Sequence, residues 1–392
     1  MLSGLLKDEV RKKIVGILFY VALTIELLLM ILEKSEISFG YESYVFRVTF
    51  LISLVAVAFM KRDRKEWLIL LFLIIFTTFC YYLSGKNDLL RIVVFMMAAR
   101  DIDLTKAMKY SFFVSLSGFL LIALLSIFGI LGDVVLVADY GRGIADETRL
   151  VLGFGHPNTL FGCVYVLALM WLWIYGKKAS FLMYAVLVLT SFVFAAFTRS
   201  RTAIFVMTMT LALGIILRIF PKLKDVKALY FLEGVFTPGI CMGLAVLAAH
   251  LCGLIYDNIG FPEPYWSFFW KVEKMLNFRV SNLYYEVEDR GGILRNWKLF
   301  AGHNADGYFD IGWARLFYWY GIIPTALIAV AIILLIYVCY KKRDMWTMLI
   351  IFSLSVYTII EATYVTRYIG RCFFLLIAGV YLGCLFKGKI NE

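Results

Sequence analysis

The chain has 392 residues, of which 62% are hydrophobic and 17% aromatic, and it contains only six prolines. Apolar runs of about twenty residues recur throughout, which excludes a soluble globular protein. The net charge of +11 does not require a nucleic-acid partner, because basic residues that anchor a membrane protein at the cytoplasmic surface account for it. The seven cysteines form no Cys-x-x-Cys pair, so the sequence predicts neither a zinc site nor a disulfide framework.

The apolar runs predict an all-α fold, a polytopic membrane protein with about 12 transmembrane helices. We expect a single integral membrane domain over residues 1–392. The longest stretch between two predicted spans, 257–310, is expected to form a long extracytoplasmic loop with short amphipathic helices around 264–280. The predicted spans are residues 14–32, 44–60, 67–83, 88–99, 109–131, 158–175, 179–197, 202–220, 228–256, 311–340, 345–363 and 369–386.

Basic residues set the expected orientation. In this assignment of spans the lysine-rich clusters all fall on one side of the membrane, and the positive-inside rule makes that side cytoplasmic. Both termini are then cytoplasmic, and the segments 132–155, 198–201 and 257–310 are extracytoplasmic. The clusters lie at residues 7–13, 61–65, 100–109, 177–178, 222–227, 341–343 and 387–389.

Arginine rather than lysine dominates the basic residues expected outside. Positive charge there opposes the insertion rule, and a guanidinium binds phosphate through a planar, bidentate fork. The pattern therefore favours a pyrophosphate whose lipid tail stays in the bilayer. The alternative is contact with lipid headgroups and local ion pairs with Asp139, Asp146, Glu147 and Glu288. These arginines are at positions 142, 149, 199, 201, 279, 290, 295, 315, 367 and 371.

The first outer motif is Arg-Leu-Val-Leu-Gly-Phe-Gly-His-Pro-Asn at 149–158, which leads into an apolar helix. Gly153 and Gly155 permit a tight backbone turn, and the proline suits the first turn of a helix. His156 or Asn158 can then face the outer aqueous side. For His156, a role in capping the helix is the alternative to a chemical role.

The second motif is the turn Thr-Arg-Ser-Arg-Thr at 198–202. Two arginines in so short a turn are costly to place near hydrocarbon, which indicates a purpose for Arg199 and Arg201. Ser200 or Thr202 can cap the helix that follows, whose N-terminus then favours an anion. A capped turn with two interfacial arginines is the alternative.

The third motif lies in the long loop, where Arg279 follows Leu-Asn-Phe. The loop ends at Asp310, in the sequence Asp-Ile-Gly-Trp-Ala-Arg-Leu-Phe-Tyr-Trp-Tyr-Gly-Ile-Ile that opens a membrane helix. Aromatic residues such as Trp266, Trp270 and Tyr284 could stack on sugar rings, but interfacial belts enrich tryptophan and tyrosine for other reasons.

Together these three motifs, in this order, resemble the repeat-unit polymerases of bacterial capsule and O-antigen synthesis (the Wzy type), most closely those of capsules and exopolysaccharides in low-GC Gram-positive bacteria. That family shows an Arg-x-x-x-Gly-Phe-Gly-His-Pro-Asn segment, a Ser-Arg-Thr turn, and a loop arginine after a Leu-Thr-Gly-like turn. An Asp-Asn-x-Tyr-like segment then precedes a Tyr-Gly-Ile-Ile helix. The resemblance spans roughly residues 149–323, and here Asn-Phe stands where Thr-Gly is common.

The resemblance implies an inverting, GT-C-like glycosyltransferase of the bacterial plasma (inner) membrane. Such an enzyme moves a growing glycan from undecaprenyl pyrophosphate onto the terminal sugar of a lipid-linked repeat unit. A flippase and a chain-length regulator of the same pathway are the partners it suggests. Preorganised arginines can stabilise the leaving pyrophosphate without a cofactor, and no acidic cluster with ligand spacing on the outer side predicts a metal.

The residues that this reaction needs fall into two groups. For the proton of the acceptor hydroxyl, the candidate bases are His156, Asp310, His303 and Glu361. Asp310 and His156 lead among these four. Arg149, Arg201 and Arg279 are expected to stabilise the leaving pyrophosphate first, followed by Arg199 and Arg142, and Arg279 is the arginine placed with His156 and Asp310 as catalytic. The other residues are expected to bind the pyrophosphate or the sugars. This second group is Arg149, Arg201, Arg199, Arg142, Asn158, Arg290 and His303.

Two other classes of protein fit the sequence. A transporter or flippase of lipid-linked oligosaccharides has a similar number of spans, and its charges lie near the midplane. Here Glu26, Arg47, Arg91 and Glu233 are the charged residues of the central spans. An O-antigen-type ligase differs from a polymerase in its acceptor, which the sequence does not distinguish. The outer arginines argue against a scaffold without activity.

Overall fold

The computed structural model describes residues 8–138, 146–256, 263–286, 290–303, 305–362 and 369–388. Within these ranges the chain is helical except for one two-stranded hairpin, β1 (Val135–Ala138) and β2 (Glu147–Leu150), which confirms the predicted all-α class in its main feature. The helices are α1 (Asp8–Glu33), α2 (Glu42–Phe59), α3 (Arg64–Ser84), α4 (Asp88–Ala98), α5 (Leu104–Ile127), α6 (Pro157–Tyr175), α7 (Phe181–Thr198), α8 (Arg201–Ile219), η2 (Pro221–Asp225), α9 (Lys227–Val235), η3 (Phe236–Cys241), α10 (Met242–Tyr256), α11 (Glu263–Leu276), α12 (Asn282–Tyr285), η4 (Leu294–Asn296), α13 (Gly312–Tyr320), α14 (Ile322–Lys342), α15 (Met345–Thr358) and α16 (Ile369–Phe386).

Nine helices in the described ranges are long and apolar enough to cross a membrane. They are α1, α2, α3, α5, α6, α7, α8, α14 and the 30-residue run that α9, η3 and α10 form together. Many of their leucine, isoleucine and phenylalanine side chains remain exposed on the outside of the bundle, as a surface in contact with lipid requires. The protein is therefore a multi-pass membrane protein that associates with a lipid bilayer.

Two of the predicted spans are too short to cross a bilayer as straight helices. The span predicted at 88–99 is α4, close to its predicted bounds, and its 11 residues extend about 16 Å, which is short of the roughly 30 Å hydrocarbon layer. The span predicted at 345–363 ends earlier than expected, since α15 has 14 residues and stops at Thr358. The span predicted at 369–386 coincides with α16 (Ile369–Phe386). In place of about twelve full-length spans, the described residues thus contain nine long spans together with shorter apolar helices.

The single helix predicted over 311–340 is wrong, because Gly321 divides it into α13 and α14. Gly321 has a φ of +97°, and a Cβ there would lie 2.6 Å from Leu299 O and from the Cα of Phe300. The close approach lets the loop bind the start of α14, where the amides of Ile322 and Ile323 donate to Lys298 O and Leu299 O at 3.0 and 3.1 Å. A helical hydropathy pattern does not reveal such a break.

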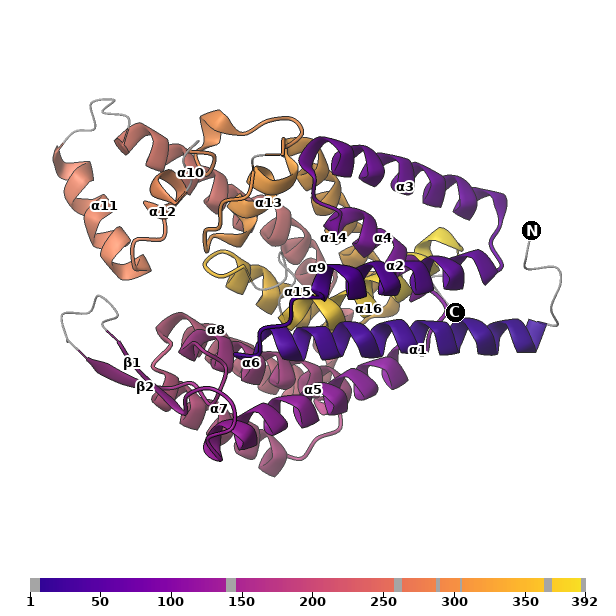
Figure 1. The fold of residues 1–392 in the computed structure, drawn as a ribbon, viewed down its shortest axis with the longest axis horizontal. Coiled ribbons are helices and arrows are strands. Elements are labelled where there is room, and N and C mark those ends of the chain that lie inside the picture. Colours follow the sequence, from indigo (N-terminus) through magenta and orange to yellow (C-terminus); the bar gives the residue numbers. More distant parts are fainter. Residues whose placement is uncertain are drawn as a thin grey trace.

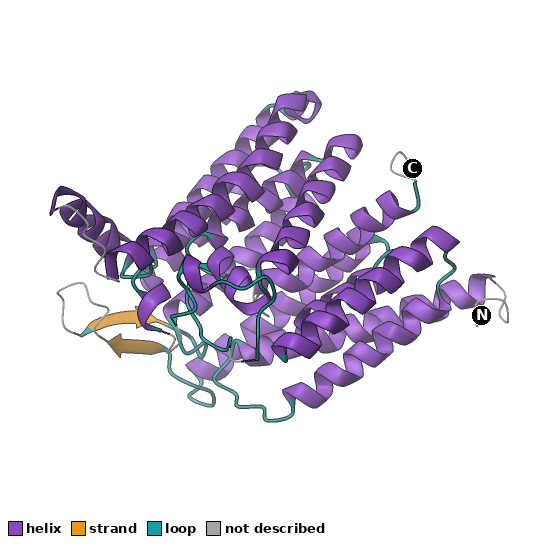
Figure 2. Ribbon diagram, turned by 90° about the horizontal axis from the view of Figure 1, so that it is seen from above, coloured by secondary structure: helices purple, strands orange, loops and turns teal. Residues whose placement is uncertain are grey.

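The bundle has two distinct ends (Figure 1). One end, the terminal end, holds the first and last described residues, and there Lys387 pairs with Asp101 in the turn between α4 and α5. The opposite end, the site end, holds the β1–β2 hairpin, α11, α12 and the loops that surround them. The same division is visible from above in Figure 2, where the strands and most of the loops lie far from both termini.

Candidate active site

Arg279 follows α11 in a strained turn. The two residues before it, Asn277 and Phe278, have φ values of 58° and 60°, a left-handed conformation that non-glycine residues seldom adopt in succession. Glu273 holds the turn from within the protein. Its carboxylate, which is fully buried, accepts hydrogen bonds from the amides of Val280 at 3.1 Å and Ser281 at 3.2 Å. The turn therefore fixes the direction in which Arg279 leaves the backbone.

Arg279 binds two carboxylates from distant parts of the chain. Its Nε lies 3.0 Å from Asp310 Oδ2, and its Nη2 donates to Glu361 Oε1. Gly312 brings these acids together, since it packs against the end of α15, where a Cβ would meet Thr358 Cγ2 at 2.6 Å. The Arg279 side chain is 12% exposed, whereas Asp310 and Glu361 are 34% and 21% exposed. Both carboxylates thus remain in reach of the solvent.

Arg279, Asp310 and Glu361 form a trio, and the pKa values of Glu361 and Arg279 are shifted for different reasons. Burial raises the pKa of Glu361 to about 7, with Asp310 raising it further while Arg279 and Arg315 lower it. Burial works to lower the pKa of Arg279, but the two carboxylates outweigh it and the net shift is upward. Arg279 is therefore always charged, and Glu361 can exchange a proton near neutral pH.

His156 caps α6 and lies beside this trio. Its Nδ1 accepts a hydrogen bond from the Asn158 amide at 3.1 Å, and the residues before it turn as predicted, with φ values of 77° at Gly153 and 68° at Gly155. Partial burial of the ring lowers the pKa of His156, as do Arg149 and Arg279, whereas Asp310 raises it. A neutral imidazole that accepts at Nδ1 carries its proton on Nε2 and acts there as a donor.

A second charged group adjoins His156 on β2. Glu147 and Arg149 are two residues apart on one strand, so both point to the same face, and both are buried. Glu147 accepts from Arg149 at 2.5 Å and from Arg199, at the end of α7, at 2.8 Å. The predicted alternative of local ion pairs is thus confirmed for these two arginines. Arg149 is only 3% exposed, whereas Arg199 is 53% exposed.

The remaining predicted residues are spread over the site end. Arg201 begins α8 and is exposed, but Ser200 before it makes no side-chain capping bond, contrary to expectation. The guanidinium carbon of Arg290 lies 4.4 Å from the centre of the Tyr284 ring. His303 is exposed and lies against Gly85 at the end of α3. Arg142 falls outside the described residues.

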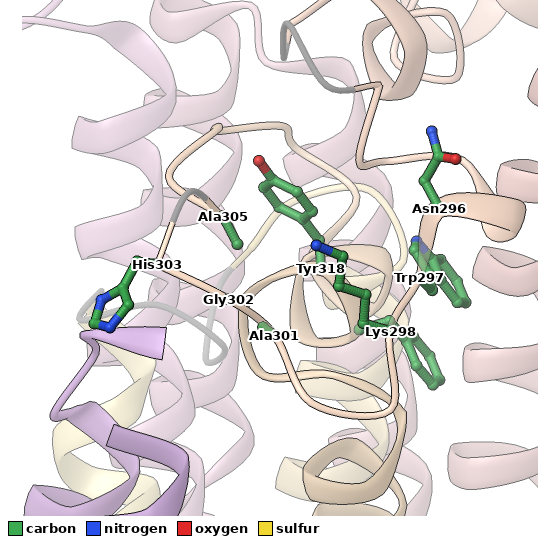
Figure 3. A pocket seen from close by; sticks show the side chains of 9 residues that line it. Asn296, Trp297, Lys298, Ala301, Gly302, His303, Ala305 and Tyr318 are labelled. Atoms are coloured by element: carbon green, nitrogen blue, oxygen red, sulfur yellow. The ribbon is translucent and has the colours of Figure 1, made fainter. Parts of the chain in front are cut away.

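A small polar cavity of about 160 Å³ lies between the loop at 296–305 and α13. Figure 3 shows His303 on one side of it and Trp297, Lys298 and Tyr318 on the other. The Trp297 ring stacks flat on Phe317, with centroids 4.4 Å apart and an angle of 3°. Its Nε1 is buried and has no hydrogen-bond partner among the residues the structure describes. An acceptor that entered the cavity could satisfy this donor.

An apolar groove of about 290 Å³ runs along α5, α6 and α7 toward the same end of the bundle. Its floor is α6, with the buried Leu160 and Cys163, and its margin includes Leu120 and Thr190, which are exposed on the outside of the bundle. The groove ends at Phe154, in the loop between Arg149 and His156. It thus connects the surface that faces lipid with the charged residues of β2 and the α6 cap.

Sequence reasoning gave Glu273 no role, and it grouped Arg315 with the outer arginines expected to favour a pyrophosphate. Arg315 on α13 is fully buried. Its guanidinium carbon lies 3.6 Å from the centre of the Tyr308 ring, and its Nη2 donates to Phe309 O. Its Nε and Nη1 have no hydrogen-bond partner among the described residues. An arginine within an apolar helix was the one signal available for it in the sequence.

No group of three or more His, Cys, Asp or Glu side chains in the described ranges could hold a metal ion. No protein-family model, no curated protein and no solved structure matches the chain. The resemblance to repeat-unit polymerases therefore stays a prediction that the three sequence motifs carry.

Proposed function

We propose that the protein is an inverting glycosyltransferase that extends a polysaccharide at the extracytoplasmic face of a bacterial plasma membrane. It transfers a growing glycan from undecaprenyl pyrophosphate onto the terminal sugar of a lipid-linked repeat unit. One observation carries the proposal: Arg279 binds Asp310 and Glu361, and the motif that contains His156 adjoins this trio. The turn that contains Arg199 joins them through Glu147, so the three motifs, which are separated in sequence, meet at one end of a membrane bundle.

The orientation follows from charge. The lysine clusters around 61–65, 177–178 and 341–343 lie in turns at the terminal end, and the positive-inside rule assigns that end to the cytoplasm. The site end then faces outward, and both termini are cytoplasmic. This is the side on which completed lipid-linked repeat units would be joined.

In the proposed step Glu361 accepts the proton of an acceptor hydroxyl. The hydroxyl oxygen forms a bond to the anomeric carbon of the donor, and the bond from that carbon to the pyrophosphate oxygen breaks with its electrons on the oxygen. Attack from the face opposite the leaving group inverts the anomeric centre. Arg279 orients both carboxylates, and the pKa of Glu361, raised to about 7 by burial, suits a general base at neutral pH.

The leaving pyrophosphate needs cations that are exposed at the site end. Arg199 is half exposed beside Glu147, and Arg201 stands exposed at the start of α8, whose N-terminus favours anions. The Nε2 proton of neutral His156 offers a further donor. Arg149, buried against Glu147, is better suited to hold the hairpin in place than to bind substrate.

Two neighbouring spaces suit the rest of the substrates. The apolar groove along α6 opens toward lipid and ends at Phe154, beside the charged residues, as an isoprenoid chain with a pyrophosphate head requires. The polar cavity at Trp297 offers an aromatic wall together with the hydroxyl of Tyr318 and the amine of Lys298, which suits one sugar ring of the acceptor. The ring centroid of Tyr318 lies 5.5 Å from that of Phe309, which precedes Asp310 in the chain.

The transporter alternative lacks comparable support among the described residues. Glu26 and Arg91, two of the charged residues in the central spans, pair with each other at 3.3 Å, and Thr49 donates to Glu26 at 2.6 Å. These contacts hold α1 against α2 and α4, so we assign the two charges a role in helix packing. A ligase remains the nearest alternative, because it would use the same donor with a different acceptor.

Reconstitution tests the proposal. The purified protein is placed in liposomes with lipid-linked repeat units from the native host, and products are separated by length with and without a metal chelator. Polymers of several units together with released undecaprenyl pyrophosphate would support polymerisation. Movement of labelled units across the bilayer without any elongation would instead establish a flippase. Transfer that occurs only when a different acceptor lipid is added would establish a ligase.

A further inference from the structure

A large basic cavity lies at the terminal end, on the opposite side of the bundle from the proposed site. Its volume is about 990 Å³, and it is bounded by α5, the α6–α7 turn, the region between α8 and η2, and the α14–α15 turn. Six lysines and two arginines line it, among them Lys177, Lys178, Lys342 and Arg343. Basic residues from four separate parts of the chain therefore surround one concave space.

The cavity holds almost no compensating negative charge. Asp344 is the one acid in its lining, and its carboxylate caps α15 by accepting from the amides of Trp346 and Thr347 at 3.1 Å. It also accepts from Thr347 Oγ1 and from the Tyr381 hydroxyl. Within the described ranges none of the eight basic side chains pairs with a carboxylate. The space therefore attracts anions strongly.

An apolar cavity of about 390 Å³ adjoins the basic one. It lies between α8, α9 and α15 and is lined by leucine, isoleucine, methionine and phenylalanine side chains and by one acid, Glu233, whose carboxylate accepts a hydrogen bond from Thr237 Oγ1 at 2.7 Å. Leu217 and Met345 line both cavities, so the two spaces share a boundary. Leu232, which is 60% exposed, stands at its outer margin. A ligand that fills both spaces has an anionic head and an apolar tail.

We infer that this pair of cavities binds an anionic phospholipid, with its phosphate among the lysines and an acyl chain between α8, α9 and α15. Basic pockets between membrane helices bind such headgroups in this way. A free phosphate would use only the basic cavity, and a neutral phospholipid would gain little from eight cations. Cardiolipin, with two phosphates, fits the number of basic side chains best. The inference does not depend on the function proposed for the other end.

Native mass spectrometry of the purified, delipidated full chain tests the inference by titration with cardiolipin or phosphatidylcholine. The test variant combines Lys177→Ala, Lys178→Ala and Lys342→Ala. The control combines Lys12→Ala, Lys13→Ala and Lys65→Ala, which removes the same charge from exposed positions near the same end, outside the cavity. We expect the test variant to weaken cardiolipin binding about a hundredfold and the control to weaken it less than threefold.

A second variant, Leu232→Trp, fills the apolar cavity from an exposed position without a change in charge. It should weaken cardiolipin binding and leave the binding of inorganic pyrophosphate in the basic cavity unchanged. Three results overturn the inference. They are equal losses in the two lysine variants, tight binding of phosphatidylcholine to the unaltered protein, and displacement of cardiolipin by pyrophosphate at equal concentration, which would indicate an anion site only.

Discussion

The Nε of Arg279 lies 3.0 Å from Asp310 Oδ2, although the two residues stand 31 positions apart. The contact joins the strained turn after α11 to the start of α13, and Glu361 binds the same guanidinium from the end of α15. A single partly buried cation thus sets the geometry of two carboxylates. This arrangement explains how a loop can hold two carboxylates in a fixed position.

Removal of the proposed base should abolish most of the activity. We expect Glu361→Gln to lower the rate of elongation about 10²–10⁴-fold, the usual contribution of a general base. Asp310→Asn should cost less, because that side chain orients Arg279 and takes no proton. The rates are compared in proteoliposomes with matched protein levels. A larger loss of elongation rate in Asp310→Asn than in Glu361→Gln would make Asp310 the base and Glu361 the residue that orients Arg279.

The activity should depend on pH in a way that Glu361 sets. Because its pKa is raised to about 7, the carboxylate becomes available as a base as the pH rises through that value, and the rate should rise with it. The residual activity of Glu361→Gln should lack this step. A pH–rate profile of both proteins between pH 5 and 9 makes the comparison, and an identical profile in the two would remove Glu361 from the step.

The same pKa shift should affect stability in the opposite direction. The folded protein holds this proton more tightly than the unfolded chain, whose glutamate titrates near 4.5. The stabilising contribution is therefore complete below about pH 4.5 and is lost as the pH rises through about 7. We expect the melting temperature of the unaltered protein to fall over this interval relative to that of Glu361→Gln. Parallel melting curves across the interval would contradict the assignment.

Glu147 should be important for stability. Glu147→Gln leaves the buried Arg149 without its carboxylate, and loss of one member of a buried ion pair costs about 3–5 kcal/mol. The exposed pair of Lys86 and Asp306 provides the control, since Asp306→Asn should cost less than about 1 kcal/mol. Thermal unfolding in detergent compares the two variants. Equal melting temperatures would show that the β2 network is not structurally important.

Glu273 should act by positioning Arg279. Glu273→Ala removes the acceptor of two buried amides, at a cost of about 1–3 kcal/mol, and should lower kcat while the pH–rate profile keeps its shape. Lys274→Ala, on the exposed side of the same helix, is the matched control and should behave like the unaltered protein. A change in the pH profile of Glu273→Ala would mean that Glu273 takes part in proton transfer.

Much of the fold followed from hydropathy, but the site followed from it only in part. The long spans and the extra-membrane segment with a helix at 263–276 were predictable, because apolar length and amphipathic spacing are local properties. The φ of +97° at Gly321 was not, since it depends on the close approach of the loop at Leu299 and Phe300. The β1–β2 hairpin escaped prediction because its strands have only four residues each.

The structure brings together His156, Arg279 and Asp310, which the motifs singled out, but the motifs did not assign their partners. Glu147 lies within the same segment as Arg149, yet only the pairing of side chains on one face of β2 reveals that it neutralises both Arg149 and Arg199. Glu361 is 82 residues from Arg279 in the chain, a separation at which sequence alone indicates no contact. Spacing thus identified the cations of the site more readily than the acids that bind them.

The most direct test of the proposed function uses a host that makes the cognate lipid-linked repeat unit but lacks its own polymerase. The protein and its Arg279→Ala and Arg279→Lys variants are expressed at equal membrane levels, and glycan length is read on a gel. We predict a ladder with the unaltered protein, single units with Arg279→Ala, and little recovery with lysine, which cannot bind two carboxylates as a planar fork does. A normal ladder with Arg279→Ala would contradict the role assigned to this residue.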